Sequence, residues 1–122
     1  MNTIVVYSRY SIFSHSCESE LRSEGYSPCV VASEEGLAKC FRELLEVDLV
    51  ILNIESRSEN SRHLLESVRQ SNPNVKVVLT SDSSDFWNDF STWLADACIV
   101  TSADLSGLKD TVKRFLTPAL VS

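Results

Sequence analysis

The sequence predicts a single doubly wound α/β domain, in which helices cover both faces of a parallel sheet. Short, nearly continuous apolar runs alternate with longer segments of helical period, a pattern typical of strands buried on both sides between crossover helices. Five strand–helix units joined by right-handed crossovers give a (βα)5 fold with strand order 2-1-3-4-5. We expect residues 1–122 to form one domain, because the length suits one core and the chain has no linker or internal repeat.

Five segments rich in β-branched residues are predicted to be the strands. IVVY, LVILNI and VKVVL are the continuous apolar runs expected of strands buried on both faces, whereas CVVA is shorter and suits a strand near an edge. The predicted bounds are Thr3–Tyr7, Pro28–Ala32, Asp48–Ile54, Val75–Thr80 and Ala97–Thr101.

Helix ends are also visible in the sequence. Gly25 can end the first helix in the left-handed conformation, Ser33 can cap the second, and Pro73 stops the third. Apolar residues at helical spacing mark the faces that we expect to meet the sheet. They are Leu37, Phe41, Leu44 and Leu45 in the second helix, Phe86, Trp87, Phe90, Trp93 and Leu94 in the fourth, and Leu105, Leu108, Val112, Phe115 and Leu116 in the last.

Composition excludes several classes of protein. No segment approaches the roughly 20 apolar residues needed to cross a bilayer, and the N-terminus lacks the early basic region of a secretory signal. We therefore expect a cytoplasmic protein that is not a membrane protein. The net charge is −6 and the eleven Lys and Arg residues are dispersed, so the phosphate backbone of a nucleic acid would repel this domain. We therefore do not expect it to bind nucleic acid.

Cysteine and histidine spacing indicates no metal site. The four cysteines are scattered singly, without the close pairs of a zinc site or a redox dithiol, and we expect them to be reduced, small core residues. The two histidines are expected at the surface. No metal and no cofactor are predicted. These residues are Cys17, Cys29, Cys40, Cys98, His15 and His63.

The topology predicts where a functional site would lie. Ligands of doubly wound sheets bind beyond the carboxyl ends of the strands, where the strand order reverses. The residues there are mostly hydroxyls with one amide and one carboxylate, that of Glu55. They are Tyr7, Ser8 and Arg9, then Asn53 to Ser56, then Thr80 and Ser81, and finally Thr101 and Ser102.

Three segments make the whole chain resemble the receiver domains of two-component response regulators. DLVILN (48–53) resembles the third strand DLVILD, which ends on the phosphoaccepting aspartate; VKVVLTS (75–81) is similar to the fourth strand with its terminal hydroxyl. LADACIVTS (94–102) is similar to GADDYLVKP around the fifth strand. The resemblance implies a CheY-like, flavodoxin-like fold and a role in two-component signal transduction.

The resemblance breaks at the residues that carry the chemistry. The paired acids that hold Mg²⁺ in the family fall on Tyr7 and Ser8, the phosphoacceptor on Asn53, and the conserved lysine on Thr101. The hydroxyl position, Thr80, is kept. Phosphoryl transfer to a carboxylate needs that nucleophile, an oxygen-ligated dication and a cation over the developing charge. We therefore expect a degenerate phosphorylation pocket and no enzymatic activity.

The resulting expectation is a pseudo-receiver, a protein-interaction module that works without phosphorylation. The aromatic switch position falls on Cys98, so the usual conformational reporter is also missing. The partner would be a kinase, an output domain, a scaffold or a second copy. The resemblance implies contact through the face of the fourth helix, fifth strand and fifth helix, where Trp87 and Trp93 lie at the margins of the fourth helix's apolar stripe and could anchor an interface.

Two alternatives stay open at this point. The hydroxyl-rich run Tyr7–Ser11 before a helix could hold a phosphate or a flavin, as in a flavodoxin-like cofactor binder, although it contains no glycine for close backbone approach. The other alternative is a receiver that is phosphorylated through an unrecognised acid such as Glu55. For Asn53 itself we expect a hydrogen bond to Thr80 or to a loop amide, because buried polar groups need partners.

Overall fold

A computed structural model describes residues 2–43, 46–54, 59–81, 95–100 and 105–116. The helix expected around Phe86–Leu94 lies outside these residues, and α4 is the last helix among the described ones. None of the described helices has both the length and the apolar character that crossing a bilayer requires. In chain order the elements are β1 (Thr3–Tyr7), α1 (Ser11–Ser23), β2 (Ser27–Val31), α2 (Glu34–Glu43), β3 (Leu49–Asn53), α3 (Glu59–Ser71), β4 (Lys76–Ser81), β5 (Ala97–Val100) and α4 (Ser106–Leu116).

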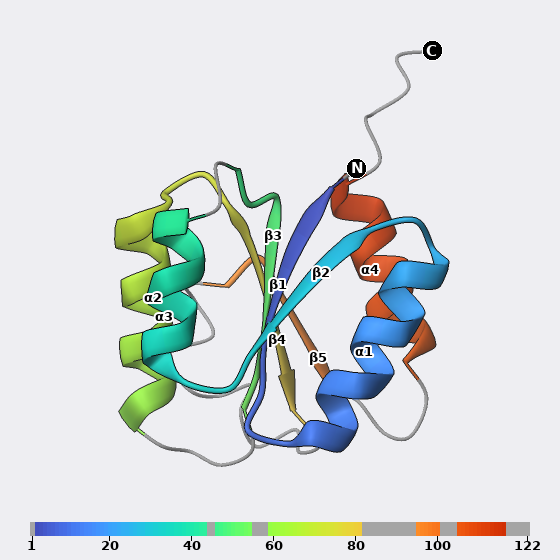
Figure 1. The fold of residues 1–122 in the computed structure, drawn as a ribbon, viewed down its shortest axis with the longest axis horizontal. Coiled ribbons are helices and arrows are strands. Elements are labelled where there is room, and N and C mark those ends of the chain that lie inside the picture. Colours follow the sequence, from blue (N-terminus) through green and yellow to red (C-terminus); the bar gives the residue numbers. More distant parts are fainter. Residues whose placement is uncertain (1, 44–45, 55–58, 82–94, 101–104, 117–122) are drawn as a thin grey trace.

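The strands form one parallel sheet in the order β2-β1-β3-β4-β5, which confirms the predicted fold class and strand order. The strand predicted to lie near an edge, β2, is an edge strand. Figure 1 shows α2 and α3 on one face of the twisted sheet and α1 and α4 on the other.

The described residues form two hydrophobic clusters, one on each face of the sheet. In β1, Val5 and Tyr7 belong to the cluster under α2 and α3, whereas Ile4 and Val6 belong to the cluster under α1 and α4. Successive side chains of a strand point to opposite faces, so a strand covered on both sides needs apolar residues at every position. This explains the continuous apolar runs in the sequence.

The predicted helix ends are confirmed. Gly25 has φ +92° and donates its N–H to the carbonyl of Arg22, while the N–H of Tyr26 reaches the carbonyl of Leu21. This is the Schellman arrangement, which satisfies the last carbonyls of α1. Ser33 Oγ accepts the N–H of Gly36 at 3.0 Å and caps α2. The third helix, α3, ends two residues before Pro73.

Strand ends differ from the prediction by single residues. The bounds of β1 are as predicted, but β2 begins one residue early, at Ser27, because its N–H donates to the carbonyl of Asn2 at 2.8 Å. Strand β4 continues to Ser81, which pairs with Val100 of β5. Strand β3 is one residue shorter than predicted at each end.

A polar clamp holds β5 to the amino-terminal edge of the sheet. Asp96 Oδ2 accepts the N–H of Val77 at 2.7 Å and an Arg69 guanidinium N–H at 2.9 Å. Arg69 also donates to the carbonyl of Val75 at 2.7 Å. These contacts, which the sequence patterns did not predict, tie the end of α3 and the start of β5 to β4; we call Arg69 and Asp96 the amino-edge clamp.

Candidate functional site

The candidate site lies at the carboxyl edge of the sheet, where β1, β3 and β4 end side by side. Tyr7 is in register with Leu52, so Ser8 follows β1 beside the end of β3. Asn53, the last residue of β3, is in register with Thr80 of β4. The strand order reverses between β1 and β3, which is where a doubly wound sheet places its ligand site.

A chain of hydrogen bonds joins the three strand ends. Ser8 Oγ donates to Asn53 Oδ1 at 3.0 Å, and Asn53 Nδ2 donates to Thr80 Oγ1 at 3.0 Å. Ser8 Oγ already accepts the N–H of Tyr10 at 3.0 Å, so its own hydrogen is available for the amide oxygen of Asn53. We call Ser8, Asn53 and Thr80 the hydroxyl–amide chain. The expected bond between Asn53 and Thr80 is confirmed, and the bond from Ser8 is an addition.

The hydroxyl–amide chain is buried and electrically neutral. Ser8 and Thr80 are each only 1% exposed, and Asn53 is half-buried. A buried polar group without a partner costs free energy; here each polar group bonds another neutral group. The hydroxyl–amide chain therefore links the ends of β1, β3 and β4 at the carboxyl edge.

These residues do not fit a Mg²⁺ site. In proteins Mg²⁺ is held chiefly by carboxylates. Ser8 and Asn53 of the hydroxyl–amide chain offer neutral oxygens that are already hydrogen-bonded. Tyr7 does not join them, because it is 5% exposed and packs into the cluster under α2 and α3. No group of three or more His, Cys, Asp or Glu residues that could hold a metal occurs in the described parts of the chain.

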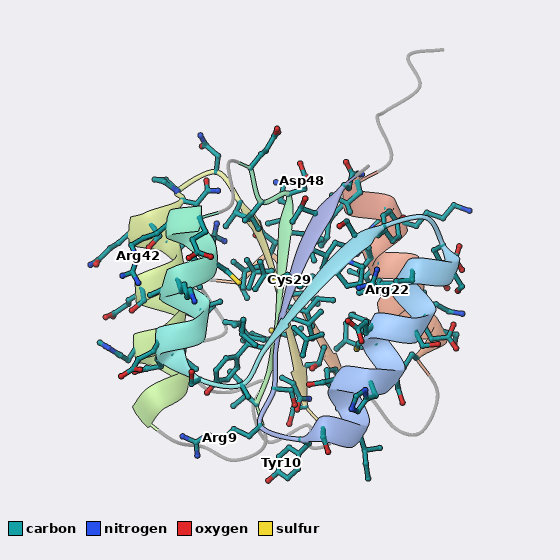
Figure 2. The ribbon with its side chains drawn as sticks, in the orientation of Figure 1. Arg9, Tyr10, Arg22, Cys29, Arg42 and Asp48 are labelled. Atoms are coloured by element: carbon teal, nitrogen blue, oxygen red, sulfur yellow. The ribbon has the colours of Figure 1, made fainter. Side chains whose placement is uncertain are left out.

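Two cavities flank the end of β1. One, of about 300 Å³, combines Tyr7 and Arg9 with the start of α2, where Glu34 and Glu35 add negative charge. Figure 2 shows Arg9 and Tyr10 projecting from the carboxyl edge of the sheet. The other cavity, of about 250 Å³, lies beside the first turns of α1 and is where the flavodoxin-like alternative would place a phosphate. Its lining is Ser8, Arg9, Ser11, Ser14, His15, Glu18, Val30 and Ala32.

Several predicted site residues lie outside the described part of the chain: Thr101, Trp87, Trp93 and Glu55. The switch position, Cys98, lies in β5, is half-buried, and packs against the cluster under α2 and α3. Burial raises the pKa of its thiol. Both histidines are exposed, as expected.

Similar solved structures are response regulators. TrrA of Thermotoga maritima, solved in complex with Mg²⁺-BeF, has a TM-score of 0.84 and 29% identity over 95% of this chain and 100% of its own. TrrA in complex with the histidine kinase ThkA matches with a TM-score of 0.81 and 29% identity, covering 96% of this chain and 100% of the matched chain. A CheY-like receiver domain from Methanospirillum hungatei has a TM-score of 0.78 and 24% identity over 93% and 92% of the two chains. No family model and no curated protein sequence matches this chain.

The chain has the receiver-domain fold of two-component response regulators. The agreement extends over nearly the full length of both molecules, as the resemblance of the strand motifs implied. In the receiver fold the ends of β1, β3 and β4 converge on one edge, and the resemblance assigns the phosphoacceptor to the position of Asn53. At that position this chain has an amide that bonds two hydroxyls.

Proposed function

We propose that this chain is a pseudo-receiver, which acts in two-component signalling by binding a protein partner and neither binds Mg²⁺ tightly nor accepts a phosphoryl group. The observation that carries the proposal is the hydroxyl–amide chain. Asn53, at the end of β3, uses both ends of its amide to bond Ser8 and Thr80. At the phosphoacceptor position, a neutral amide that links two strand ends provides no nucleophile for phosphoryl transfer.

The electrostatics of phosphoryl transfer support the same conclusion. A carboxylate and an incoming phosphoryl group are both anionic, so they approach only where a dication and a lysine offset their repulsion. Tyr7 and Ser8 offer neutral oxygens, and position 101 carries a threonine. Restoring the nucleophile alone would leave that repulsion in place.

Incubation with a small phosphodonor and Mg²⁺, followed by intact-mass measurement, tests the proposal. We expect no phosphoryl adduct on the natural chain and at most a trace on Asn53→Asp. The matched positive control is the fourfold variant Tyr7→Asp, Ser8→Asp, Asn53→Asp and Thr101→Lys, which should gain one phosphoryl group. A clear adduct on the natural chain would sink the proposal and point to another acid, such as Glu55.

Partner binding is proposed by analogy with TrrA, which was solved in complex with the histidine kinase ThkA. For this chain the partner is a kinase, an output domain, a scaffold or a second copy, and Trp87 and Trp93 are the proposed anchors. Replacing an anchor by alanine should weaken association by at least ~1 kcal/mol and leave the fold intact. A tryptophan that serves the core would instead cost roughly 3 kcal/mol or more of stability.

Measuring self-association by sedimentation and stability by urea unfolding, on each tryptophan variant, separates the two roles.

The flavodoxin-like alternative has its own simple readout. A flavin absorption band in the purified protein would support it, and a colourless protein would support the pseudo-receiver.

A further inference from the structure

Two of the four thiols lie side by side, although their sequence spacing gives no sign of a pair. Cys29 Sγ of β2 and Cys40 Sγ of α2 are 3.1 Å apart. Both residues belong to the face covered by α2 and α3, where Cys40 is part of the hydrophobic cluster and Cys29 packs against it. Figure 2 shows Cys29 on β2 in the middle of the molecule.

Two neighbouring elements, β2 and α2, place the two sulfurs together. Ser33 caps α2 directly after β2, through the N–H of Gly36. A Cβ added to Gly36 would lie 3.3 Å from the Cβ of Val31, so the first turn of α2 packs closely on the end of β2. The position of Cys40 above β2 therefore follows from two ordered elements and a short connection.

We propose that Cys29 and Cys40 form a reversible disulfide site, oxidised by a low-molecular-weight disulfide such as oxidised glutathione. A disulfide requires an S–S distance of about 2.05 Å, so the two sulfurs need to approach by about 1 Å for the bond to form. This inference goes beyond the proposed function and does not depend on it.

The other two cysteines are in the wrong places to compete for Cys29. Cys17 is in the cluster on the opposite face of the sheet, under α1 and α4. Cys98 is on β5, and four strand spacings separate β5 from β2, which amounts to about 19 Å. The fold therefore leaves Cys40 as the partner for Cys29.

Exposure sets the order of the two exchange steps. Cys29 is half-buried and Cys40 is 9% exposed, so Cys29 meets the oxidant first. Burial, together with the hydrogen bond and charge of Cys29, raises the pKa of Cys40 to about 12; the nearby charges of Glu43 and Lys39 act on it in opposite directions. Cys40 is therefore protonated near neutral pH and is not the thiol that attacks the oxidant first. Its place beside Cys29, with the two Sγ atoms 3.1 Å apart, makes it the resolving thiol.

The steps balance as ordinary thiol–disulfide exchange. The Cys29 thiolate attacks one sulfur of oxidised glutathione, which breaks the glutathione S–S bond, forms a mixed disulfide and releases one glutathione thiol. Cys40 then loses its proton and attacks the sulfur of Cys29, which releases the second glutathione thiol. Two protein thiols are oxidised, one glutathione disulfide is reduced, and the two protons end on the released glutathiones.

The experiment exposes the folded full chain to oxidised glutathione, quenches with acid, denatures, alkylates the remaining thiols and measures the intact mass. We expect alkylation of two cysteines in place of four, no retained glutathione, and one cross-linked peptide containing Cys29 and Cys40. Reduction should return all four thiols. The double variant Cys17→Ser with Cys98→Ser is the matched control, and it should still form the bond.

Single variants test the order of the steps. Cys40→Ser should keep glutathione on Cys29, because no resolving thiol remains. In Cys29→Ser, Cys40 should react at least ten times more slowly than Cys29 does in Cys40→Ser. Four alkylatable thiols in the treated natural chain, or a cross-link through Cys17 or Cys98, would overturn the proposal; the peptide map of the natural chain decides this even where a variant fails to fold.

Discussion

Replacing Asn53 by alanine should reveal how much the hydroxyl–amide chain stabilises the carboxyl edge. The variant loses the bonds to Ser8 and Thr80, both 3.0 Å long. A neutral hydrogen bond contributes about 1 kcal/mol, and a buried group left without its partner costs about 1–3 kcal/mol. Ser8 Oγ keeps a weaker acceptor, the carbonyl of Tyr10 at 3.4 Å. We therefore expect the free energy of unfolding to fall by about 2 kcal/mol.

Urea unfolding followed by circular dichroism measures this loss. At a typical slope of about 2 kcal/mol per molar urea, the midpoint should move by about 1 M. Asn74→Ala is the control, because it deletes the same side chain at an exposed position before β4 and should change stability by less than about 0.5 kcal/mol.

A double-mutant cycle isolates the bond between Asn53 and Thr80. Thr80→Val removes the hydroxyl with little change of shape, and its effect should combine with that of Asn53→Ala with a coupling of about 1 kcal/mol. Effects that add within about 0.3 kcal/mol would show that the two side chains do not stabilise each other and that the bond between them contributes nothing to stability.

Three further outcomes follow from the fold. Gly25→Ala should cost about 1 kcal/mol in urea unfolding, because φ is +92° there and space is not limiting. Asp96→Ala should cost about 1–3 kcal/mol, since it strands the buried N–H of Val77 and removes the ion pair with Arg69; a loss under 0.5 kcal/mol would refute the clamp. Burial raises the pKa of Cys17 from 9.0 to about 12, so as the pH rises this thiol ionises in the unfolded chain before it ionises in the folded one. The stability that Cys17 contributes should therefore be complete below about pH 8.5 and decline toward pH 12. The decline should be shallower in Cys17→Ala.

The sequence contained enough information for the sheet and for part of the site. Apolar runs such as IVVY and LVILNI predict two-sided burial, which in turn requires crossover helices, and the strand order follows. Asn53 was expected to bond Thr80 or a loop amide because buried polar groups need partners, and the structure shows the bond to Thr80. This bond could be predicted once the strands had been assigned.

The contacts that were not predicted depend on where a helix lies on the sheet. Leu37 and Cys40 are three residues apart and share a helix face, so the sequence can show that Cys40 meets the sheet. Which residue of β2 Cys40 reaches depends on the β2–α2 connection and on the close approach of Gly36 to β2. Neither of these leaves a periodic pattern in the sequence. Arg69 and Asp96 meet across 27 positions for a similar reason: α3 ends where β5 begins.

The neutrality of the hydroxyl–amide chain makes a single acidic substitution at this edge unfavourable. A carboxylate introduced alone at position 8 or 53 would lie among neutral hydroxyl and amide groups at a largely buried edge, where desolvation disfavours its charged form. Further charged replacements nearby would be needed to offset that cost.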